Sequence, residues 1–294
     1  MNSERFAIGV DVGGSHLTSS VVDLQEGKVV SESIVTPMDS RGPLEHVISC
    51  FKANLEETLR TCGLPVSRIG FAFPGPFDYE KGISWMKQKF DNLYGVDLPA
   101  ALRSALDVPD AASLEFRFIN DASAFAVGEC FCGSGKGFGR VMAVTLGTGV
   151  GSGFVADGVL DESSELVPPG GEVWNLPFEG GIVDENFSTR WFVSRWAALT
   201  GESIKGAKDV ADKYGLDPRA DAVFAEFGTR LAAFASPWLE KFRADAFVMG
   251  GNISREYPKF RETLLAALPE GVEVRTSALL DKAAMIGAAS LFSK

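Results

Sequence analysis

Cysteine and histidine are both scarce in this sequence of 294 residues. The four cysteines are too few for a disulfide scaffold, and their number is ordinary for a protein kept in a reducing compartment. Cys130 and Cys132 form a C-x-C pair, but no second pair with metal-ligand spacing follows, and there are only two histidines. Buried thiols therefore explain the cysteines better than a metal site does.

Long apolar runs and an excess of basic residues are also absent. No apolar run reaches the roughly 18 residues that span a bilayer, and the first residues, 1–6, lack the basic start and apolar core of a signal peptide. The formal net charge of −11 disfavours binding to a nucleic-acid backbone. An anionic small ligand remains compatible with this charge, because backbone N–H groups bind phosphate without a basic side chain. We therefore expect a cytoplasmic protein that binds neither membrane nor nucleic acid.

Glycine-rich turns between β-like runs are the most prominent feature that is present. Asp11-x-Gly-Gly-Ser15 and Thr145-x-Gly-Thr-Gly149 each interrupt an apolar, β-branched stretch, and they lie about half a chain length apart. An ordinary hairpin turn explains either motif alone. Two similar units in one chain of this length indicate a duplicated domain with a cleft between the halves.

The rest of the pattern alternates strands and helices, as in an α/β protein. A helical pattern over 43–62 stops at a glycine, and a buried strand over 69–73 ends at Phe73-Pro-Gly-Pro76. Residues 168–184 are irregular and polar, which suits a binding loop. Further expected elements are strands at 6–23, 28–36, 116–119, 141–155 and 246–252, and helices at 98–106, within 187–239 and at 279–292.

Asn120 and Asp121 stand where a short apolar run, 116–119, meets an Ala-rich helical run. Either side chain can cap the helix by accepting from free N–H groups of its first turn. Alternatively, Asp121 is a general base at the carboxyl end of a strand, where open α/β sheets bind ligands. The two glycine turns, together with a third Gly-Gly turn at 250–251, favour the second explanation.

The glycine turns have the composition of phosphate-binding loops. Glycine lets the backbone approach a phosphate within hydrogen-bonding distance, and Ser15, Thr18, Thr145 and Thr148 supply hydroxyl donors. Asp11 cannot donate to a phosphate at neutral pH, so its place in such a loop is explained if it holds Mg²⁺ directly or through water.

These motifs together resemble the ROK family (repressors, open reading frames and kinases) within the actin-like ATPase and sugar-kinase superfamily. The resemblance covers essentially the whole chain. It rests on residues 8–15, on Phe73-Pro-Gly-Pro76, on Asn120-Asp-Ala-x-Ala124 with Gly128-Glu129, and on 146–151, 250–252 and 286–289.

The resemblance implies two ribonuclease H-like α/β domains with a central cleft, which we place at 1–118 plus 279–294 and at 119–278. It implies an ATP- and Mg²⁺-dependent hexose kinase that phosphorylates a sugar hydroxyl, expected to be the 6-hydroxyl of glucose or a related hexose. Asp121 would be the general base, and Asp11 would position Mg²⁺. The ATP-binding residues would be Asp11, Gly13, Gly14, Ser15, Thr18, Gly147, Thr148, Gly149, Gly250, Gly251 and Asn252, and the sugar-binding residues Gly75, Asn120, Asp121, Glu172, Asn175, Asp184 and Glu185.

The chain departs from the family in one stretch. Family members often carry Gly-Glu-x-Gly-His, whose histidine also joins a cysteine cluster that holds a structural zinc. Here the stretch reads Gly171-Glu-Val-Trp-Asn175 and no cysteine cluster follows, so we expect no zinc. A further sugar-site acid is either Asp184 or Glu185. Trp174 either stacks on a sugar face or belongs to the core.

Two other functions are weighed against this kinase. A non-catalytic sugar-binding sensor would need a broken phosphate loop or a missing base, and the sequence shows neither. A kinase that uses polyphosphate would favour a basic surface track, against which the acidic balance argues. The repressors of the family carry a DNA-binding domain ahead of the kinase-like fold, for which the residues before Phe6 leave no room. The resemblance also implies a homodimer, which the residues do not support independently.

Overall fold

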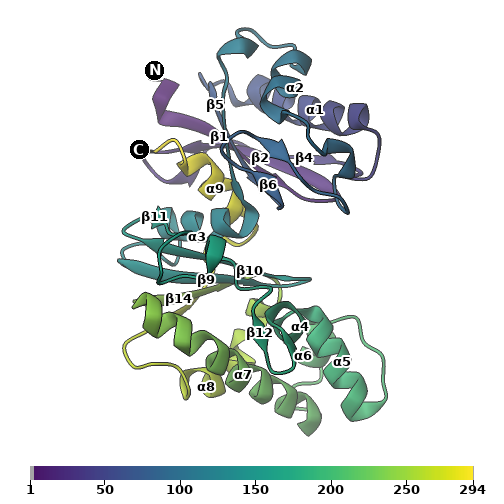
Figure 1. Ribbon diagram of the computed structural model, residues 1–294, viewed down its shortest axis with the longest axis vertical. Coiled ribbons are helices and arrows are strands. Elements are labelled where there is room, and N and C mark those ends of the chain that lie inside the picture. Colours follow the sequence, from purple (N-terminus) through teal and green to yellow (C-terminus); the bar gives the residue numbers. More distant parts are fainter. Residues whose placement is uncertain (1–2, 294) are drawn as a thin grey trace. The chain divides into compact units, whose positions relative to one another are not determined.

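The computed structural model describes residues 3–293, which form two compact α/β units (Figure 1). The first unit runs to Cys132 and resumes at Asp281, and the second comprises Gly133–Leu280. Each unit has its own mixed β-sheet and its own hydrophobic core.

The sheet of the first unit has the strand order β3-β2-β1-β5-β8, with β4 also paired to β2. β1, β2 and β3 form an antiparallel meander, whereas β5 and β8 run parallel to β1. The strands are β1 (Phe6–Val12), β2 (His16–Asp23), β3 (Lys28–Val29), β4 (Ile34–Pro37), β5 (Arg68–Phe73) and β8 (Glu115–Asn120).

The prediction of one continuous strand over residues 28–36 is wrong, because the structure has two separate strands there, β3 and β4. The Val21 N–H donates to Ser31 Oγ at 2.9 Å, and the Ser20 and Ser33 hydroxyl groups lie 2.8 Å apart. Between β3 and β4, these serine side chains bond to β2 in place of backbone ladder hydrogen bonds. The chain therefore leaves the edge of β2 after β3 and returns to it at β4.

The α-helices of the first unit within residues 3–293 are α1 (Leu44–Cys62), α2 (Leu98–Ala105), α3 (Asp121–Cys132) and α9 (Ala283–Ser290). α1 buries Val47, Phe51 and Leu55 on one face and ends at Cys62, directly before the capping residue Gly63, as the sequence predicts. α1 packs against β2 and β4, while α9 packs against β1 and β5. A small hairpin, β6 (Phe77–Asp78) and β7 (Ile83–Ser84), follows β5.

The second unit repeats the strand arrangement of the first, with the order β11-β10-β9-β14-β15. Two strands joined by a glycine turn are antiparallel, and two later strands run parallel to the first of them. This repetition confirms the prediction of a duplicated α/β fold. The strands are β9 (Arg140–Leu146), β10 (Val150–Ala156), β11 (Val159–Leu160), β14 (Ala246–Gly250) and β15 (Glu273–Thr276).

Helices dominate the second unit between β10 and β14, as expected. The long helix α7 packs against α8 (Figure 1). Aromatic residues such as Phe192, Phe224 and Phe227 lie in the core of this unit. The irregular stretch 168–184 contains a single 3₁₀ turn, the short hairpin β12 (Pro177–Phe178) and β13 (Gly181–Ile182), and the first two residues of α4. The helices are α4 (Val183–Phe187), α5 (Thr189–Thr200), α6 (Ala207–Ala211), α7 (Pro218–Phe242) and α8 (Tyr257–Leu265).

The boundary between the units lies later in the chain than the position at 118–119 suggested by the sequence. α3 belongs to the first unit because it packs closely against α9. A Cβ atom at Gly287 would lie 1.9 Å from the Ala124 carbonyl oxygen, and one at Gly128 would lie 2.1 Å from that of Ala283. Only residues without a side chain permit this approach, which places residues 119–132 with the first unit.

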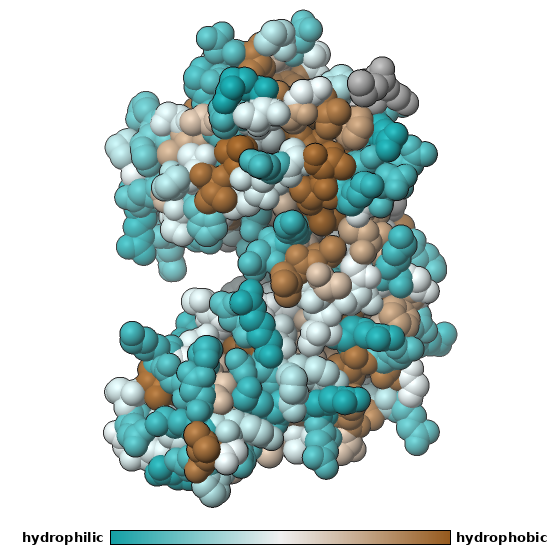
Figure 2. Space-filling view, turned by 180° about the vertical axis from the view of Figure 1, so that it is seen from behind, coloured by the Kyte–Doolittle hydropathy of each residue, from teal (hydrophilic) through white to brown (hydrophobic). Residues whose placement is uncertain are grey.

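The surface is mixed in character. Among residues 3–293, no helix is long and apolar enough to cross a membrane. On the face shown in Figure 2, hydrophobic residues form several separate patches surrounded by hydrophilic ones.

Candidate functional site

In the first unit, the predicted site residues gather at one edge of the sheet. β1, β5 and β8 are adjacent and parallel, so their carboxyl ends meet at the same edge. Asp11 lies near the end of β1, Gly75 follows β5, and Asn120 ends β8. This is the edge at which open α/β sheets bind ligands.

Asn120 caps the helix that follows it. Its Oδ1 accepts hydrogen bonds from the N–H groups of Ala122 at 2.9 Å and Ser123 at 3.2 Å. Its Nδ2 donates to the Tyr79 hydroxyl at 3.2 Å, and that hydroxyl donates to the Phe73 carbonyl oxygen at 3.1 Å. The helix-cap explanation is therefore correct for Asn120, whose amide is held in one orientation.

Asp121 is the first residue of α3 and is half-buried. Its Oδ1 accepts from the Ala122 N–H at 2.9 Å. The helix N-terminus favours a negative charge at this place. Because Asn120 already caps the helix, the Asp121 carboxylate is available to a ligand.

Gly75 borders the side chains of Tyr79 and Asn120. The Gly75–Pro76 peptide bond is cis. A Cβ atom at position 75 would lie 3.3 Å from the Tyr79 hydroxyl and 4.0 Å from Asn120 Nδ2. A side chain here would crowd the hydroxyl that orients Asn120.

The first glycine turn connects β1 to β2. The Gly13 N–H donates to the His16 carbonyl, and the carbonyl groups of Gly14 and Ser15 accept from Ser40 and Met38. Among the described residues, the N–H groups of Gly14 and Ser15 have no hydrogen-bond partner. Two adjacent free donors are suited to an anion. Thr18 pairs with Asp11 in the β1–β2 ladder.

Asp11 lies in an unfavourable environment for its charge. Burial, and secondarily the negative charge of Asp121, raise its pKa from 3.8 to about 6, while His16 and Lys89 oppose the rise. A carboxyl group with this environment gains from a nearby cation. Within the part of the chain that the structure describes, no group of three or more His, Cys, Asp or Glu side chains forms a metal cluster.

In the second unit, the second glycine turn and the Gly-Gly turn lie side by side. β9 and β14 are parallel neighbours whose register pairs Thr145 with Gly250. Gly251 has φ +80°, and a Cβ atom there would lie 2.4 Å from the Leu146 carbonyl oxygen. The turn therefore needs glycine. The structure brings Gly147, Thr148, Gly149, Gly250, Gly251 and Asn252 to one edge of this sheet.

Asp184 and Glu185 have different surroundings. Asp184 Oδ1 accepts from the Val150 N–H at 2.7 Å, directly after the glycine turn, and its other oxygen pairs with Arg190. Glu185 instead accepts from the Ile182 N–H at 3.1 Å and caps the start of α4. Of these two acids, Asp184 is the one that is hydrogen-bonded to the segment of the second glycine turn.

Glu172, Trp174 and Asn175 are exposed on the irregular stretch. The Trp174 indole N–H donates to Glu172 Oε2 at 3.0 Å, and the Trp174 carbonyl accepts from the Asp184 N–H at 2.9 Å. Trp174 is 43% exposed, so it does not belong to the core. Its indole orients Glu172 on the segment that leads to Asp184.

Sequence reasoning missed Tyr79 and Arg190. Tyr79 orients Asn120, and Arg190 pairs with Asp184. Neither residue stands in a recognisable motif. Tyr79 and Asn120 are 41 residues apart in the chain, and they come into contact only when the sheet folds.

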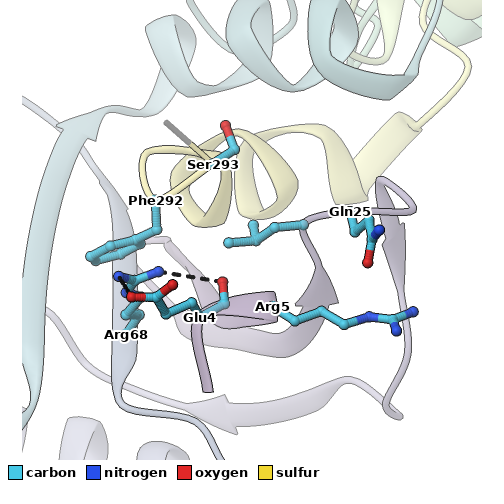
Figure 3. A pocket seen from close by; sticks show the side chains of 7 residues that line it. Glu4, Arg5, Gln25, Arg68, Phe292 and Ser293 are labelled. Carbon is cyan, nitrogen blue, oxygen red and sulfur yellow. Dashed lines mark hydrogen bonds and ion pairs between the residues drawn. The ribbon is translucent and has the colours of Figure 1, made fainter. Parts of the chain in front are cut away.

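Another hollow of the first unit lies at the opposite edge of the sheet, where β1 and β5 begin (Figure 3). Its cationic side chains already have acidic partners: Arg5 pairs with Asp23 at 2.6 Å and Arg68 with Glu4 at 3.7 Å. This hollow is therefore a poorer anion site than the glycine turn. Its lining is Glu4, Arg5, Leu24, Gln25, Arg68, Phe292 and Ser293.

Comparison with known proteins gives a consistent result. The ROK family model matches residues 7–294. A glucokinase of Thermotoga maritima is 27% identical, over 98% of this chain and 97% of its own, and an N-acetyl-D-glucosamine kinase of Pectobacterium carotovorum is 23% identical, over 89% and 88%.

Solved structures share the fold. A ROK hexokinase from Thermus thermophilus superposes with a TM-score of 0.80 at 20% identity and covers 97% of both chains. A ROK family glucokinase from Streptomyces griseus, in complex with glucose and AMPPNP, gives a TM-score of 0.74 at 24% identity over 97% of this chain and 98% of its own.

Proposed function

Since the chain belongs to the ROK family and is a sugar kinase, we propose that it transfers the terminal phosphoryl group of ATP to a hydroxyl group of a hexose. The observation that carries this proposal is the placement of Asp121. This carboxylate starts a helix at the carboxyl end of β8, beside a helix cap made by Asn120 and close enough to Asp11 to raise its pKa.

Asp121 acts as the general base. Phosphoryl transfer requires positioning and charge neutralisation more than covalent catalysis, together with one carboxylate that orients and deprotonates the nucleophile. Asn120 already satisfies the first helical N–H groups, so the base does not have to serve as the cap. The Asn120 amide, fixed by Tyr79, binds a second hydroxyl of the sugar.

ATP and Mg²⁺ are the expected cofactors. The free N–H groups of Gly14 and Ser15, and the exposed turn at Thr148 and Gly149, suit the phosphate groups. Asp11 fits Mg²⁺, since a divalent cation would offset the burial and like-charge repulsion that raise its pKa. When bound, Mg²⁺ would neutralise charge on the phosphate oxygens.

The acceptor is glucose or a close relative, phosphorylated on the 6-hydroxyl. Support comes from the similarity to a glucokinase and an N-acetyl-D-glucosamine kinase. Asp184 rather than Glu185 is the additional site acid, because Glu185 caps α4. Glu172 and Asn175 contribute further polar contacts. Asn175 is a neutral amide in place of the family's histidine, and we expect no structural zinc.

A non-catalytic sugar sensor remains the alternative from another class. It would bind sugar without turnover. The intact glycine turns and the available carboxylate of Asp121 favour catalysis instead.

The direct test is a coupled ADP-release assay with Mg-ATP and a panel of sugars: glucose, mannose, fructose, allose, N-acetylglucosamine and N-acetylmannosamine. The proposal expects sugar-dependent ADP release, with a clear preference for glucose or a close relative. Absence of turnover across the panel, with sugar binding still measured by calorimetry, would favour the sensor.

A further inference from the structure

Lys89 lies across the first glycine turn. A Cβ atom at Gly14 would lie 3.1 Å from Lys89 Cε and 4.0 Å from Nζ. The absent side chain at position 14 thus leaves the space that the lysine occupies. Nothing in the sequence motifs marks this lysine, which is 75 positions away along the chain and comes next to Gly14 only in the fold.

The segment that carries Lys89 is fixed to the turn. Met86 and Phe90 are buried in the core of the first unit on either side of it. Asn92 Nδ2 donates to the carbonyl groups of Ser40 and Gly42, and the Ser40 N–H donates to the Gly14 carbonyl at 3.2 Å. The lysine stem therefore starts from a defined backbone position next to the turn.

Lys89 has an exposed charge at a place that carries free donors, and its Nζ lies 5.9 Å from the centroid of the Phe90 ring. Its side chain is exposed, and among the described residues it forms no salt bridge. The free N–H groups of Gly14 and Ser15 belong to the same turn. A lysine ammonium beside free backbone N–H groups is a site for a phosphate group.

We propose that Lys89, together with the N–H groups of Gly14 and Ser15, binds the phosphoryl group that is transferred. This inference rests on the proposed kinase function. In the transfer, the sugar oxygen bonds to the terminal phosphorus as its bond to the ADP oxygen breaks. The hydroxyl proton passes to Asp121, and ADP keeps the electron pair. The Lys89 ammonium neutralises negative charge on the phosphoryl oxygens during this exchange.

Lys87 is a matched control. It is exposed on the same segment and, like Lys89, lies over an aromatic ring, with its Nζ 5.3 Å from the centroid of the Tyr94 ring. It adjoins neither Gly14 nor Asp11 in the structure. Replacing either lysine by methionine removes one charge from the same exposed segment, so a difference between the two variants reports position rather than net charge.

The kinetic test compares Lys89→Met, Lys89→Arg and Lys87→Met with the wild type under saturating sugar and Mg-ATP. Removal of a preorganised group that stabilises transition-state charge typically costs about 10²–10³-fold in kcat. We expect Lys89→Met to lose about 100-fold in kcat with the KM for sugar nearly unchanged, and Lys89→Arg to recover part of it. Lys87→Met should stay within about twofold. Equal activity of Lys89→Met and the wild type would overturn the inference.

A binding measurement keeps the inference separate from the proposed function. Calorimetry with sodium tripolyphosphate, without sugar or metal, should show binding to the wild type that is at least about tenfold weaker in Lys89→Met and unchanged in Lys87→Met. This result would support the site even if no sugar were phosphorylated. Equal binding to all three proteins, or no binding to the wild type at millimolar tripolyphosphate, would overturn it.

Discussion

At the scale of single residues, Asp11 and Asp121 place two carboxyl groups close enough for their negative charges to repel each other. Each carboxylate is useful when ionised, yet burial and the charge of Asp121 raise the pKa of Asp11 to about 6. The ligand-free site is therefore less stable than its neutralised form at neutral pH. Functional sites commonly carry such a cost, which a bound cation offsets.

Replacing Asp11 tests this cost directly. Between about pH 4 and pH 6 the folded state keeps a proton on Asp11 that the unfolded chain releases, so the stability of the wild type falls as pH rises through this window. Asp11→Asn should therefore raise the free energy of unfolding at pH 8 by about 3 kcal/mol, and the gain should largely vanish at pH 4. Thermal unfolding without ligands measures it. An equal gain at both pH values would show that ionisation of Asp11 is not the cause of the lower stability. We also expect the variant to lose kinase activity.

Asp184 and Glu185 form a second pair that one experiment separates. Asp184→Asn removes the charge that pairs with Arg190 next to the glycine turn. We expect it to lower kcat/KM for the sugar by about tenfold or more, in line with the loss of a charged hydrogen bond. Glu185→Gln should change kcat/KM by less than about twofold, because glutamine keeps an oxygen that can accept from the Ile182 N–H. Steady-state kinetics of both variants measure this difference. A larger effect of Glu185→Gln than of Asp184→Asn would make Glu185 the sugar-site acid instead.

At the scale of elements, Asn120 serves both β8 and α3. Its Oδ1 caps the helix and its Nδ2 is held by Tyr79. Asn120→Ala should lower the free energy of unfolding by about 1 kcal/mol, the usual cost of a lost cap, whereas Asn120→Asp should be nearly neutral. Both variants should lose sugar affinity, since neither has an amide donor. Chemical denaturation and sugar titration test the two roles separately. If alanine left the stability unchanged, the capping role would be refuted.

The elements that sequence reasoning predicted well have strong local signals. The helix over 44–62 has an apolar face and a terminal glycine, and the strands around both glycine turns are rich in β-branched residues. The break between β3 and β4 depends on serine side chains bonding across to β2, and the assignment of α3 depends on its contact with α9. These features could not be predicted because they depend on partners distant in the chain.

The candidate site shows the same limit. The glycine turns and the Asn-Asp pair were identified because they stand in motifs at strand ends. Tyr79, Arg190 and Lys89 contact site residues only in the folded chain and lack a local pattern. The choice between Asp184 and Glu185 likewise depended on seeing which N–H group each carboxylate accepts from.

At the scale of the whole molecule, the net charge of −11 bears on the phosphoryl donor. A long polyphosphate chain carries many negative charges and would be repelled by an acidic protein, whereas Mg-ATP is compact and partly neutralised. We therefore expect long-chain polyphosphate to support less than about one-hundredth of the rate seen with ATP at low ionic strength. Sugar phosphate formed from each donor, measured side by side, checks this. A comparable rate with polyphosphate would contradict it.

We propose that this chain phosphorylates a hexose hydroxyl that Asp121 deprotonates. The most direct test is turnover of Asp121→Asn with Mg-ATP and the preferred sugar of the wild type, beside sugar binding by calorimetry and thermal unfolding. We expect a folded variant that binds sugar and loses about 10²–10⁴-fold in kcat, because an amide cannot accept the proton. Near-normal turnover in Asp121→Asn would show that Asp121 is not the general base.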